Sequence, residues 1–307
     1  QNTMRNSVIV GKEGWMFRGD ELRKDLQGQK LTRKKLETWR LAFEERQAWL
    51  AARGIRFAVM VAPEAHHIYG EYVDLPGMDR VQYRLDQFLN YMRDNSSVEF
   101  IDPRAALRQA KATHLTYQKT DLHWNEYGAY IGYRQLMTHL QRWDTRFQPL
   151  GIDKFRVTHE NVRPATGNLV RMLNSPLPFT EELVLLVPRF RSNVSKEQLP
   201  RNTTYDSQMA IASQQGPSLP TAFIIHDSFF IKMSKYVDEH FSRATYLCTH
   251  EFPADLIIKD QPDIVVQEFV EWVLHEELPR NPALMQSDPG GSRPPLRTAT
   301  LPSGATR

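Results

Sequence analysis

A continuous apolar run is the feature that most constrains the fold of this chain. Residues 57–61 read Phe-Ala-Val-Met-Val, and a proline, Pro63, follows closely. A strand that is apolar on both faces is typical of a parallel sheet that helices cover on both sides. The run therefore predicts a buried strand over residues 56–62 that ends before Pro63.

Amphipathic helices alternate with such strands along the chain. Before the run, apolar residues recur at helical spacing between residues 32 and 53, and Gly54 is placed to end that helix. Further helices are predicted over residues 79–94, from Pro103 onward, over 126–142, after Ser228 and over 268–277. Further strands are predicted over residues 98–101, 183–187, 221–225 and 263–266. This alternation favours an α/β domain with a mostly parallel sheet.

Composition sets the domain organisation. The 307 residues are 41% hydrophobic and 24% charged, as in a globular protein of one large or two small domains. Residues 144–220 contain several prolines and polar turns, so we interpret them as an irregular excursion within one domain, residues 1–280. In residues 281–307 about half of the positions are Pro, Gly, Ser or Thr and none is aromatic, which predicts a disordered tail.

Charge, cysteine content and hydropathy exclude several classes. Basic residues number 39 and acidic residues 36, so the net charge of +3 offers no basic stripe, and we expect no nucleic-acid partner. Cys248 is the only cysteine, which excludes an intrachain disulfide and a thiolate metal cluster. The longest apolar runs, residues 57–62 and 183–187, are far shorter than the roughly 20 residues that cross a bilayer.

Ser228 is the first candidate for a chemical role. It lies where the apolar strand over residues 221–225 gives way to a helix that carries Phe230 and Met233. Such a turn exposes a hydroxyl, and the N–H groups of a helix N-terminus suit the oxyanion that forms when serine attacks an ester. The alternative is an ordinary serine that caps the helix.

An acid and an imidazole lie two residues apart, at Asp121 and His123, before a helix that Asn125 would cap. In an extended segment such residues project to the same side. Asp121 could therefore orient His123 while the other ring nitrogen faces an incoming hydroxyl, as a Ser-His-Asp triad requires. The alternative is an Asp–His pair on a polar loop, with Asp121 forming an Asx-turn.

Glu64, His66 and His67 form a second polar cluster, directly after the strand over residues 56–62. With Asp121 and His123 they could supply nitrogen and oxygen ligands to a metal. Adjacent histidines at a strand exit project in different directions, however, and the sequence has no HExxH or similar helical spacing. We therefore predict no metal site and no cofactor. Glu64 and His67 are instead candidates to bind substrate at the rim where ligands bind in open α/β folds.

Two tryptophans, Trp15 and Trp124, lie outside clear helical stripes. An indole face packs well on a pyranose ring, so either could bind a sugar or form a lid. Core packing is the favoured interpretation for Trp15. Trp124 lies beside the proposed base, and both substrate binding and core packing are open for it.

Five sequence blocks resemble a known family. They are GKEGWMF at residues 11–17, VAPEAHHIY at 61–69, TDLHWNEYGAY at 120–130, HDSFF at 226–230 and QPDIVVQEFVEWVL at 261–274. The combination resembles the SGNH hydrolase-like polysaccharide O-acetyltransferases of bacterial alginate and related exopolysaccharides. The Asp-x-His-Trp block, followed much later by the Asp-Ser-Phe block, is its most specific feature.

The resemblance implies an αβα sandwich with Ser228 as nucleophile, His123 as base and Asp121 as its orienting partner. It also implies a periplasmic protein, often held at the inner membrane by an N-terminal segment that is absent from the printed chain. A separate membrane acyltransferase would supply the acetyl groups, and a polysaccharide would accept them. Some members carry a further carbohydrate-binding module, whereas this chain resembles the single-domain form. The side chain that completes the oxyanion hole is open, with Asn125 and Asn168 as candidates.

Three functions follow from this site. An O-acetyltransferase would pass the acetyl group from Ser228 to a sugar hydroxyl, and a carbohydrate acetylesterase would pass it to water. A non-catalytic polysaccharide-binding scaffold would keep the fold with an idle triad. Transfer and hydrolysis share one acyl-enzyme, and they differ only in water exclusion and acceptor positioning, which no motif encodes. The resemblance favours the transferase.

Overall fold

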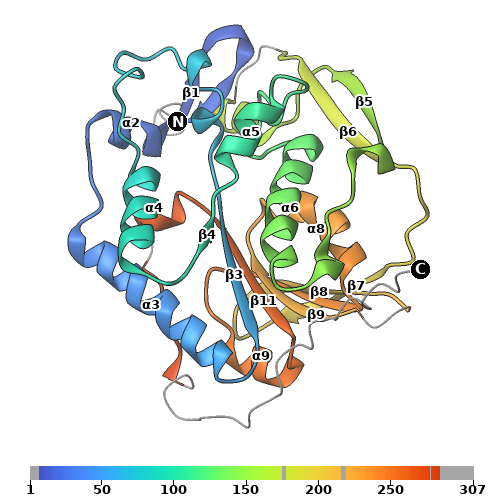
Figure 1. The fold of residues 1–307 in the computed structure, drawn as a ribbon. Helices are drawn as coiled ribbons and strands as arrows, with labels where there is room; N and C mark the ends of the chain where they lie inside the picture. The colour runs from blue at the N-terminus through green and yellow to red at the C-terminus, as the bar shows by residue number, and fades with distance from the viewer. Residues whose placement is uncertain (1–6, 175–177, 216–218, 277, 284–307) are drawn as a thin grey trace, which may run out of the picture.

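The computed structural model describes residues 7–174, 178–215, 219–276 and 278–283. Its centre is a seven-stranded sheet in the order β4-β3-β11-β9-β10-β8-β7 (Figure 1). The strands are β3 (Arg56–Ala62), β4 (Phe100–Ile101), β7 (Ser195–Asn202), β8 (Ser207–Ser213), β9 (Thr221–His226), β10 (Arg243–Cys248) and β11 (Ile264–Val270). Pairing is parallel from β4 to β10, and β8 and β7 add antiparallel to that edge. The predicted mostly parallel sheet is confirmed.

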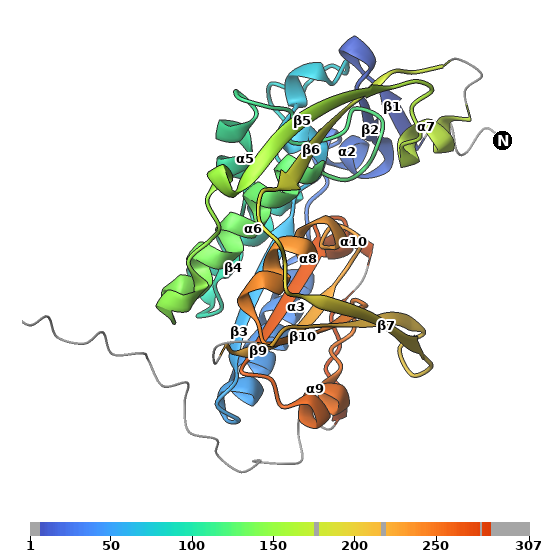
Figure 2. The ribbon, with the colours of Figure 1, turned by 90° about the vertical axis from the view of Figure 1, so that its right-hand side faces the viewer.

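Helices cover both faces of this sheet and complete the αβα sandwich (Figures 1 and 2). One face carries α3 (Arg33–Ala51), α4 (Arg84–Asn95) and α9 (Ala254–Asp260), and the other carries α5 (Arg104–Ala110), α6 (Glu126–Gln141) and α8 (Ile231–Val237). Trp39 and Phe43 of α3 pack against Phe269 of β11. Met233 of α8 meets Gly132 of α6, where the missing side chain permits the close approach.

Capping residues set the ends of the two longest helices. Thr32 Oγ1 accepts the N–H of Lys35 at the start of α3, and Asn125 Oδ1, as predicted, accepts the N–H of Gly128 at the start of α6. Gly54 follows α3 with φ of +69°, a left-handed conformation that glycine adopts without a side-chain clash. Side-chain caps and a glycine stop therefore made these boundaries readable from the sequence.

The parallel strands bring three chain segments to one edge. β3 pairs with β11 up to Ala62 and Val270, and β11 also pairs with β9. The segments that follow these three strands therefore leave the sheet beside one another, at its carboxyl edge. This is where ligands bind in open α/β folds.

The excursion predicted over residues 144–220 is more ordered than expected. β5 (Phe155–Val162) and β6 (Glu181–Pro188) form a separate antiparallel hairpin, with α7 (Asn168–Leu173) between them in the chain. β7 and β8 extend the central sheet instead. The sequence did not reveal β7 because most of its side chains are polar and exposed, so no apolar alternation marks it.

The predicted closing helix over residues 268–277 is wrong. β11 continues to Val270, and α10 covers only Val273–Glu276. Glu268 and Glu271, which fall within that predicted helix, are both buried.

Other boundaries differ less. β10 and α9 were not predicted, α4 begins at Arg84 rather than at residue 79, and α8 ends at Val237. Of the predicted tail, residues from 284 onward lie outside the described residues. Asn281, which the prediction placed in the tail, accepts a hydrogen bond from the buried Arg46 of α3 at 2.8 Å.

A small hairpin near the N-terminus lies beside the carboxyl edge. It comprises β1 (Val8–Val10) and β2 (Met16–Arg18), and α2 (Gly19–Leu26) follows it. The backbone N–H of Met16 donates to the carbonyl of Lys119, which docks the hairpin against the loop that leads to Asp121. Among the described residues, no helix combines the length and the apolar character needed to cross a membrane.

Candidate active site

Three side chains from distant parts of the chain meet at the carboxyl edge. The Nε2 atom of His123 lies 2.8 Å from Ser228 Oγ, and its Nδ1 atom lies 2.6 Å from Asp121 Oδ1. Ser228 is exposed, whereas His123 and Asp121 are half-buried. The structure thus brings the three predicted catalytic residues together, with the imidazole between hydroxyl and carboxylate. This is the geometry that a serine nucleophile with a general base needs.

Ser228 occupies a turn that precedes α8. The helix begins at Ile231, and Phe230 takes its N-cap position without a side-chain hydrogen bond. The interpretation of Ser228 as an ordinary N-cap is therefore wrong, because its hydroxyl pairs with His123 instead.

Asp227 fixes the turn that carries the serine. Its Oδ1 atom accepts the N–H of Phe229 at 2.8 Å, and its Oδ2 atom accepts the N–H of Val270 at 2.7 Å. The buried carboxylate therefore ties the serine turn to the last residue of β11. The sequence analysis did not recognise this role of Asp227.

Asp121 is held as a carboxylate by three donors. Besides the imidazole, the backbone N–H groups of His123 and Asn168 donate to it at 3.0 and 2.9 Å. Burial alone would favour the neutral acid, but these hydrogen bonds lower the pKa of Asp121 well below its ordinary value. The ionised group fixes the His123 tautomer with its proton on Nδ1, which leaves Nε2 to accept the serine proton.

Trp124 links the base loop to the serine turn. Its side chain is fully buried, Nε1 donates to the carbonyl of Phe229 at 2.8 Å, and the two rings pack edge to face. The Phe229 ring also lies 4.8 Å from the His123 ring. Of the two alternatives left open for Trp124, core packing is therefore confirmed and sugar stacking is wrong, because no face of the indole reaches solvent. Trp15 is buried too, as predicted.

The two candidates for the oxyanion hole differ. Asn125 is buried and caps α6, and its Nδ2 atom donates to the carbonyl of Leu115 at 2.6 Å, so its predicted oxyanion role is wrong. Asn168 supports the triad through its backbone N–H, while its side-chain oxygen accepts from Arg171. An oxyanion role for the Asn168 amide stays a prediction.

Glu64 and His67 lie at the carboxyl end of β3 and contact Glu271. The Nε2 atom of His67 lies 2.7 Å from Glu271 Oε2, and the backbone N–H of Glu64 donates to Glu271 Oε1 at 2.7 Å. All three side chains are buried. The predicted substrate-binding role of Glu64 and His67 is therefore wrong, because a polysaccharide has no access to them.

Glu268 and Glu271 are two buried carboxyl groups near the site that the sequence did not reveal. Burial and the nearby Asp227 raise the pKa of Glu268 well above its ordinary value, and the Asp227 backbone N–H donates to it at 3.3 Å. The available signal was position, because both residues follow the apolar residues 264–266 at the end of a predicted core strand. Polar residues there belong to the ligand-binding edge of a parallel sheet.

A mostly parallel sheet covered on both faces, with a serine, an imidazole and a carboxylate at its carboxyl edge, defines the SGNH hydrolase-like class. Within it, the family model of the SGNH hydrolase-like domain of acetyltransferase AlgX matches residues 8–210. This match covers more than half of the chain, and the chain belongs to that family. The matched segment contains Asp121 and His123 and ends before Ser228.

Individual relatives agree with this assignment. The probable alginate O-acetylase AlgJ of Pseudomonas aeruginosa is 26% identical over 212 residues, which are 69% of this chain and 50% of that protein. The chain thus spans about half the length of that curated relative. The structure of Bacillus cereus PatB1 has a TM-score of 0.66 at 14% identity, covering 88% of this chain and 98% of its own. The O-acetyltransferase domain of Pseudomonas putida AlgJ has a TM-score of 0.57 at 18% identity, covering 91% and 97%. These structural similarities show the fold.

Proposed function

We propose that this protein is an O-acetyltransferase that moves an acetyl group, through an ester on Ser228, to a hydroxyl of a bacterial exopolysaccharide. The observation that carries the proposal is the hydrogen-bonded path from Asp121 through His123 to Ser228, with distances of 2.6 and 2.8 Å. Membership of the AlgX family and the sequence similarity to AlgJ support acetyl as the transferred group.

The first half of the reaction loads the serine. Ser228 Oγ attacks the carbonyl carbon of the acetyl donor while its proton passes to His123 Nε2, and the Asp121 carboxylate stabilises the resulting imidazolium. The tetrahedral intermediate then collapses, so the bond to the donor's leaving group breaks and His123 returns the proton to that group. The product is an acetyl ester on Ser228.

The second half of the reaction transfers the acetyl group from Ser228 to the acceptor. A sugar hydroxyl oxygen attacks the acetyl carbon while its proton passes to His123 Nε2. The bond between the acetyl carbon and Ser228 Oγ breaks, and His123 protonates the departing serine. Water in place of the sugar would yield acetate, which is the esterase reaction. Because Ser228 is exposed, transfer needs an acceptor that is bound and oriented next to the ester.

We further propose an alginate-like polysaccharide as acceptor, a separate membrane acyltransferase as the source of acetyl groups and the periplasm as the site of reaction. The name of the AlgJ relative, an alginate O-acetylase, supports the acceptor. The donor and the compartment rest on the family resemblance.

Serine labelling tests the nucleophile. We expect an aryl sulfonyl fluoride to modify wild type at Ser228 and to abolish hydrolysis of an aryl acetate, whereas Ser228→Ala should be unlabelled and inactive. PatB1 has been captured as a sulfonyl adduct, which makes this reagent class suitable. Ser195→Ala, at the exposed start of β7, is the control and should behave as wild type. Full activity of Ser228→Ala would refute the assignment, and oligosaccharide binding without labelling would favour the scaffold.

Acceptor chemistry separates transfer from hydrolysis. We expect mass spectrometry to show acetyl gain by an alginate oligosaccharide incubated with wild type and an activated acetyl donor, and no gain with Ser228→Ala. Loss of acetyl groups from a pre-acetylated oligosaccharide, without any gain in the first reaction, would assign the protein as an esterase.

A further inference from the structure

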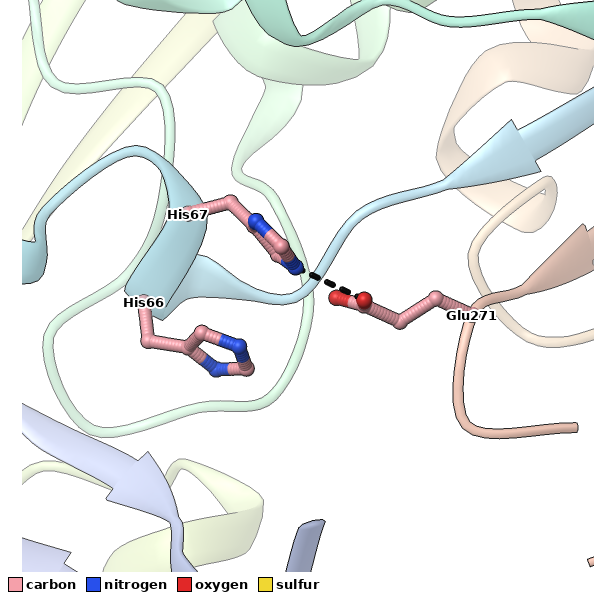
Figure 3. A group of neighbouring side chains, drawn as sticks. All are labelled: His66, His67 and Glu271. Carbon is pink, nitrogen blue, oxygen red and sulfur yellow. Dashed lines mark hydrogen bonds and ion pairs between the residues drawn. The ribbon is translucent and has the colours of Figure 1, made fainter. Parts of the chain in front are cut away.

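A second cluster of histidines and a carboxylate lies at the same edge of the sheet as the proposed triad, but inside the protein. His66, His67 and Glu271 each offer one ligand atom, and these atoms lie within 4.8 Å of one another. Figure 3 shows the two imidazole rings and the carboxylate gathered around one point. All three side chains are buried.

The backbone brings these residues together. His66 and His67 lie on a one-turn 3-10 helix, Ala65–His67, just beyond the end of β3. The prediction that adjacent histidines diverge here is therefore wrong, since the turn leaves their ring centroids 4.6 Å apart. Glu271 follows β11, and its backbone N–H donates to the carbonyl of Ala62 at 3.0 Å. Strand pairing thus fixes the carboxylate opposite the imidazoles.

Hydrogen bonding within the chain leaves this cluster incomplete. His66 Nε2, His67 Nδ1 and Glu64 Oε2 are buried and have no hydrogen-bond partner among the described residues. Buried polar atoms without partners are rare in native proteins, and each needs an explanation such as a bound ion. The backbone N–H of Glu64 donates to Glu271 Oε1 at 2.7 Å, which places Glu64 beside the cluster.

We propose that His66, His67 and Glu271 bind one divalent transition-metal ion, with zinc the best fit. Two imidazole nitrogens and one carboxylate oxygen are a donor set that zinc prefers, whereas magnesium and calcium prefer oxygen ligands throughout. On binding, His67 Nε2 exchanges its hydrogen bond to Glu271 for the metal, and its proton moves to Nδ1. Metal binding releases the protons of Glu64 and Glu271 to solvent, and the two ionised carboxylates then balance the two positive charges inside the protein.

A surface hollow lies directly beside the cluster. It is lined by His66, His67, Tyr83 and Arg108, so an ion would enter from that side.

The ion would have a positioning role rather than a catalytic one. Glu271 directly follows Val270, whose N–H is held by Asp227, and Asp227 carries the Ser228 turn. A metal on Glu271 would therefore fix the end of β11 from which the serine turn is supported. This inference stands on the buried cluster alone, so its test does not depend on the acetyl-transfer proposal.

Metal content of the purified chain tests the proposal. We expect roughly one zinc per wild-type chain, and a rise in the unfolding temperature when zinc is added back to chelator-treated protein. His66→Ala and Glu271→Gln should lose both properties. His159→Ala should keep both, because His159 belongs to an exposed group with His114 and Glu182 that has the same residue types.

Two outcomes would overturn the proposal. One is wild-type protein without metal whose unfolding temperature does not respond to zinc, and the other is an equal response in wild type and His66→Ala. A second measurement uses wild type alone, so it does not depend on the folding of a variant. Cobalt added to metal-free wild type should give the intense visible absorption of a low-coordinate site, and only the weak spectrum of hydrated cobalt would again refute the site.

Discussion

The carboxyl edge of the sheet holds two clusters of imidazole and carboxylate, and they differ in burial and in hydrogen bonding. In the exposed cluster, Asp121, His123 and Ser228 satisfy one another and the serine faces solvent. In the buried cluster, His66 and Glu64 keep atoms without partners among the described residues. Imidazole and carboxylate groups are therefore arranged for proton transfer in the exposed cluster. In the buried cluster they are arranged to stabilise the fold or to bind an ion.

The environment of these residues, more than their type, assigns the chemistry of the two clusters. A general base must meet its proton donor at hydrogen-bond distance and be reachable by substrate, as His123 is. An imidazole shut away from solvent cannot serve an external substrate, and His67 instead pairs with Glu271. Asp227 connects the two regions through Val270, so changes in one cluster should be felt weakly in the other.

His123→Ala should give the largest effect, confined to activity. Without its base, Ser228 should lose about 10⁶-fold in rate, as a serine protease does when the histidine of its triad is removed. The unfolding temperature should stay near wild type, because the half-buried ring lies at the surface of the fold. Aryl acetate hydrolysis and thermal unfolding of the same sample measure both. His159→Ala, which removes another surface imidazole, should keep the wild-type rate. A His123→Ala rate within tenfold of wild type would show that His123 is not the general base.

Glu271→Ala should show the opposite pattern, a loss of stability. It removes the acceptor of His67 Nε2 and of the Glu64 backbone N–H in a buried site, so we expect a cost of about 2–5 kcal/mol in urea unfolding. Glu182→Ala is the matched control, because Glu182 pairs with His159 at the surface and should cost less than about 1 kcal/mol. Equal costs for the two variants would show that burial does not distinguish the pairs.

Trp124→Phe tests the link between the base loop and the serine turn. Losing the hydrogen bond to the Phe229 carbonyl should cost about 1 kcal/mol and lower kcat by up to about tenfold through misplacement of His123. Trp49→Phe is the control, because the buried Nε1 of Trp49 has no partner among the described residues. Its kcat should equal that of wild type. An unchanged kcat in Trp124→Phe would show that the indole does not position His123.

A pH series separates the proposed site from the buried core. Hydrogen bonds lower the pKa of Asp121 despite burial, whereas burial lowers the pKa of His240 to about 4. The Asp121 carboxylate contributes stability at all pH values above its unfolded pKa of about 3.9. The stability deficit of Asp121→Asn should therefore be the same at about pH 5 and pH 7.

For the neutral His240 the contribution is complete above its unfolded pKa of about 6.5 and is lost as pH falls toward its folded pKa, because the unfolded chain gains a proton first. The deficit of His240→Phe should thus shrink by up to about 1.4 kcal/mol per pH unit below about pH 6.5. Urea unfolding at several pH values measures both variants. A flat difference for His240→Phe, or a sloping one for Asp121→Asn, would contradict the assigned directions.

The sequence predicted four strands of the central sheet, β3, β4, β9 and β11, and the three members of the proposed triad. Continuous apolar residues marked β3, a capping asparagine marked α6, and the two-residue spacing of Asp121 and His123 pointed both side chains the same way. These signals lie within short segments, so they can be interpreted before the rest of the fold is known.

The remaining features depend on long-range contacts. Core packing of Trp124 could not be settled from the sequence because its partner, Phe229, lies far along the chain. The role of Glu271 could not be predicted because the residues that it contacts come from the segment after β3. The polar strand β7 is defined by pairing with β8 and not by its own pattern. Burial of a polar residue is a property of its neighbours, and no single segment encodes it.

The most direct test of the acyl-transfer account is to locate the covalent intermediate. Wild type should be mixed with an activated aryl acetate, quenched in acid within the first turnover, digested and mapped by mass spectrometry. We expect one acetyl group on the peptide that contains Ser228, and none on that peptide in Ser228→Ala. Acetyl found on another residue in wild type, or turnover with Ser228 never modified, would show that Ser228 is not the nucleophile that carries the acetyl group.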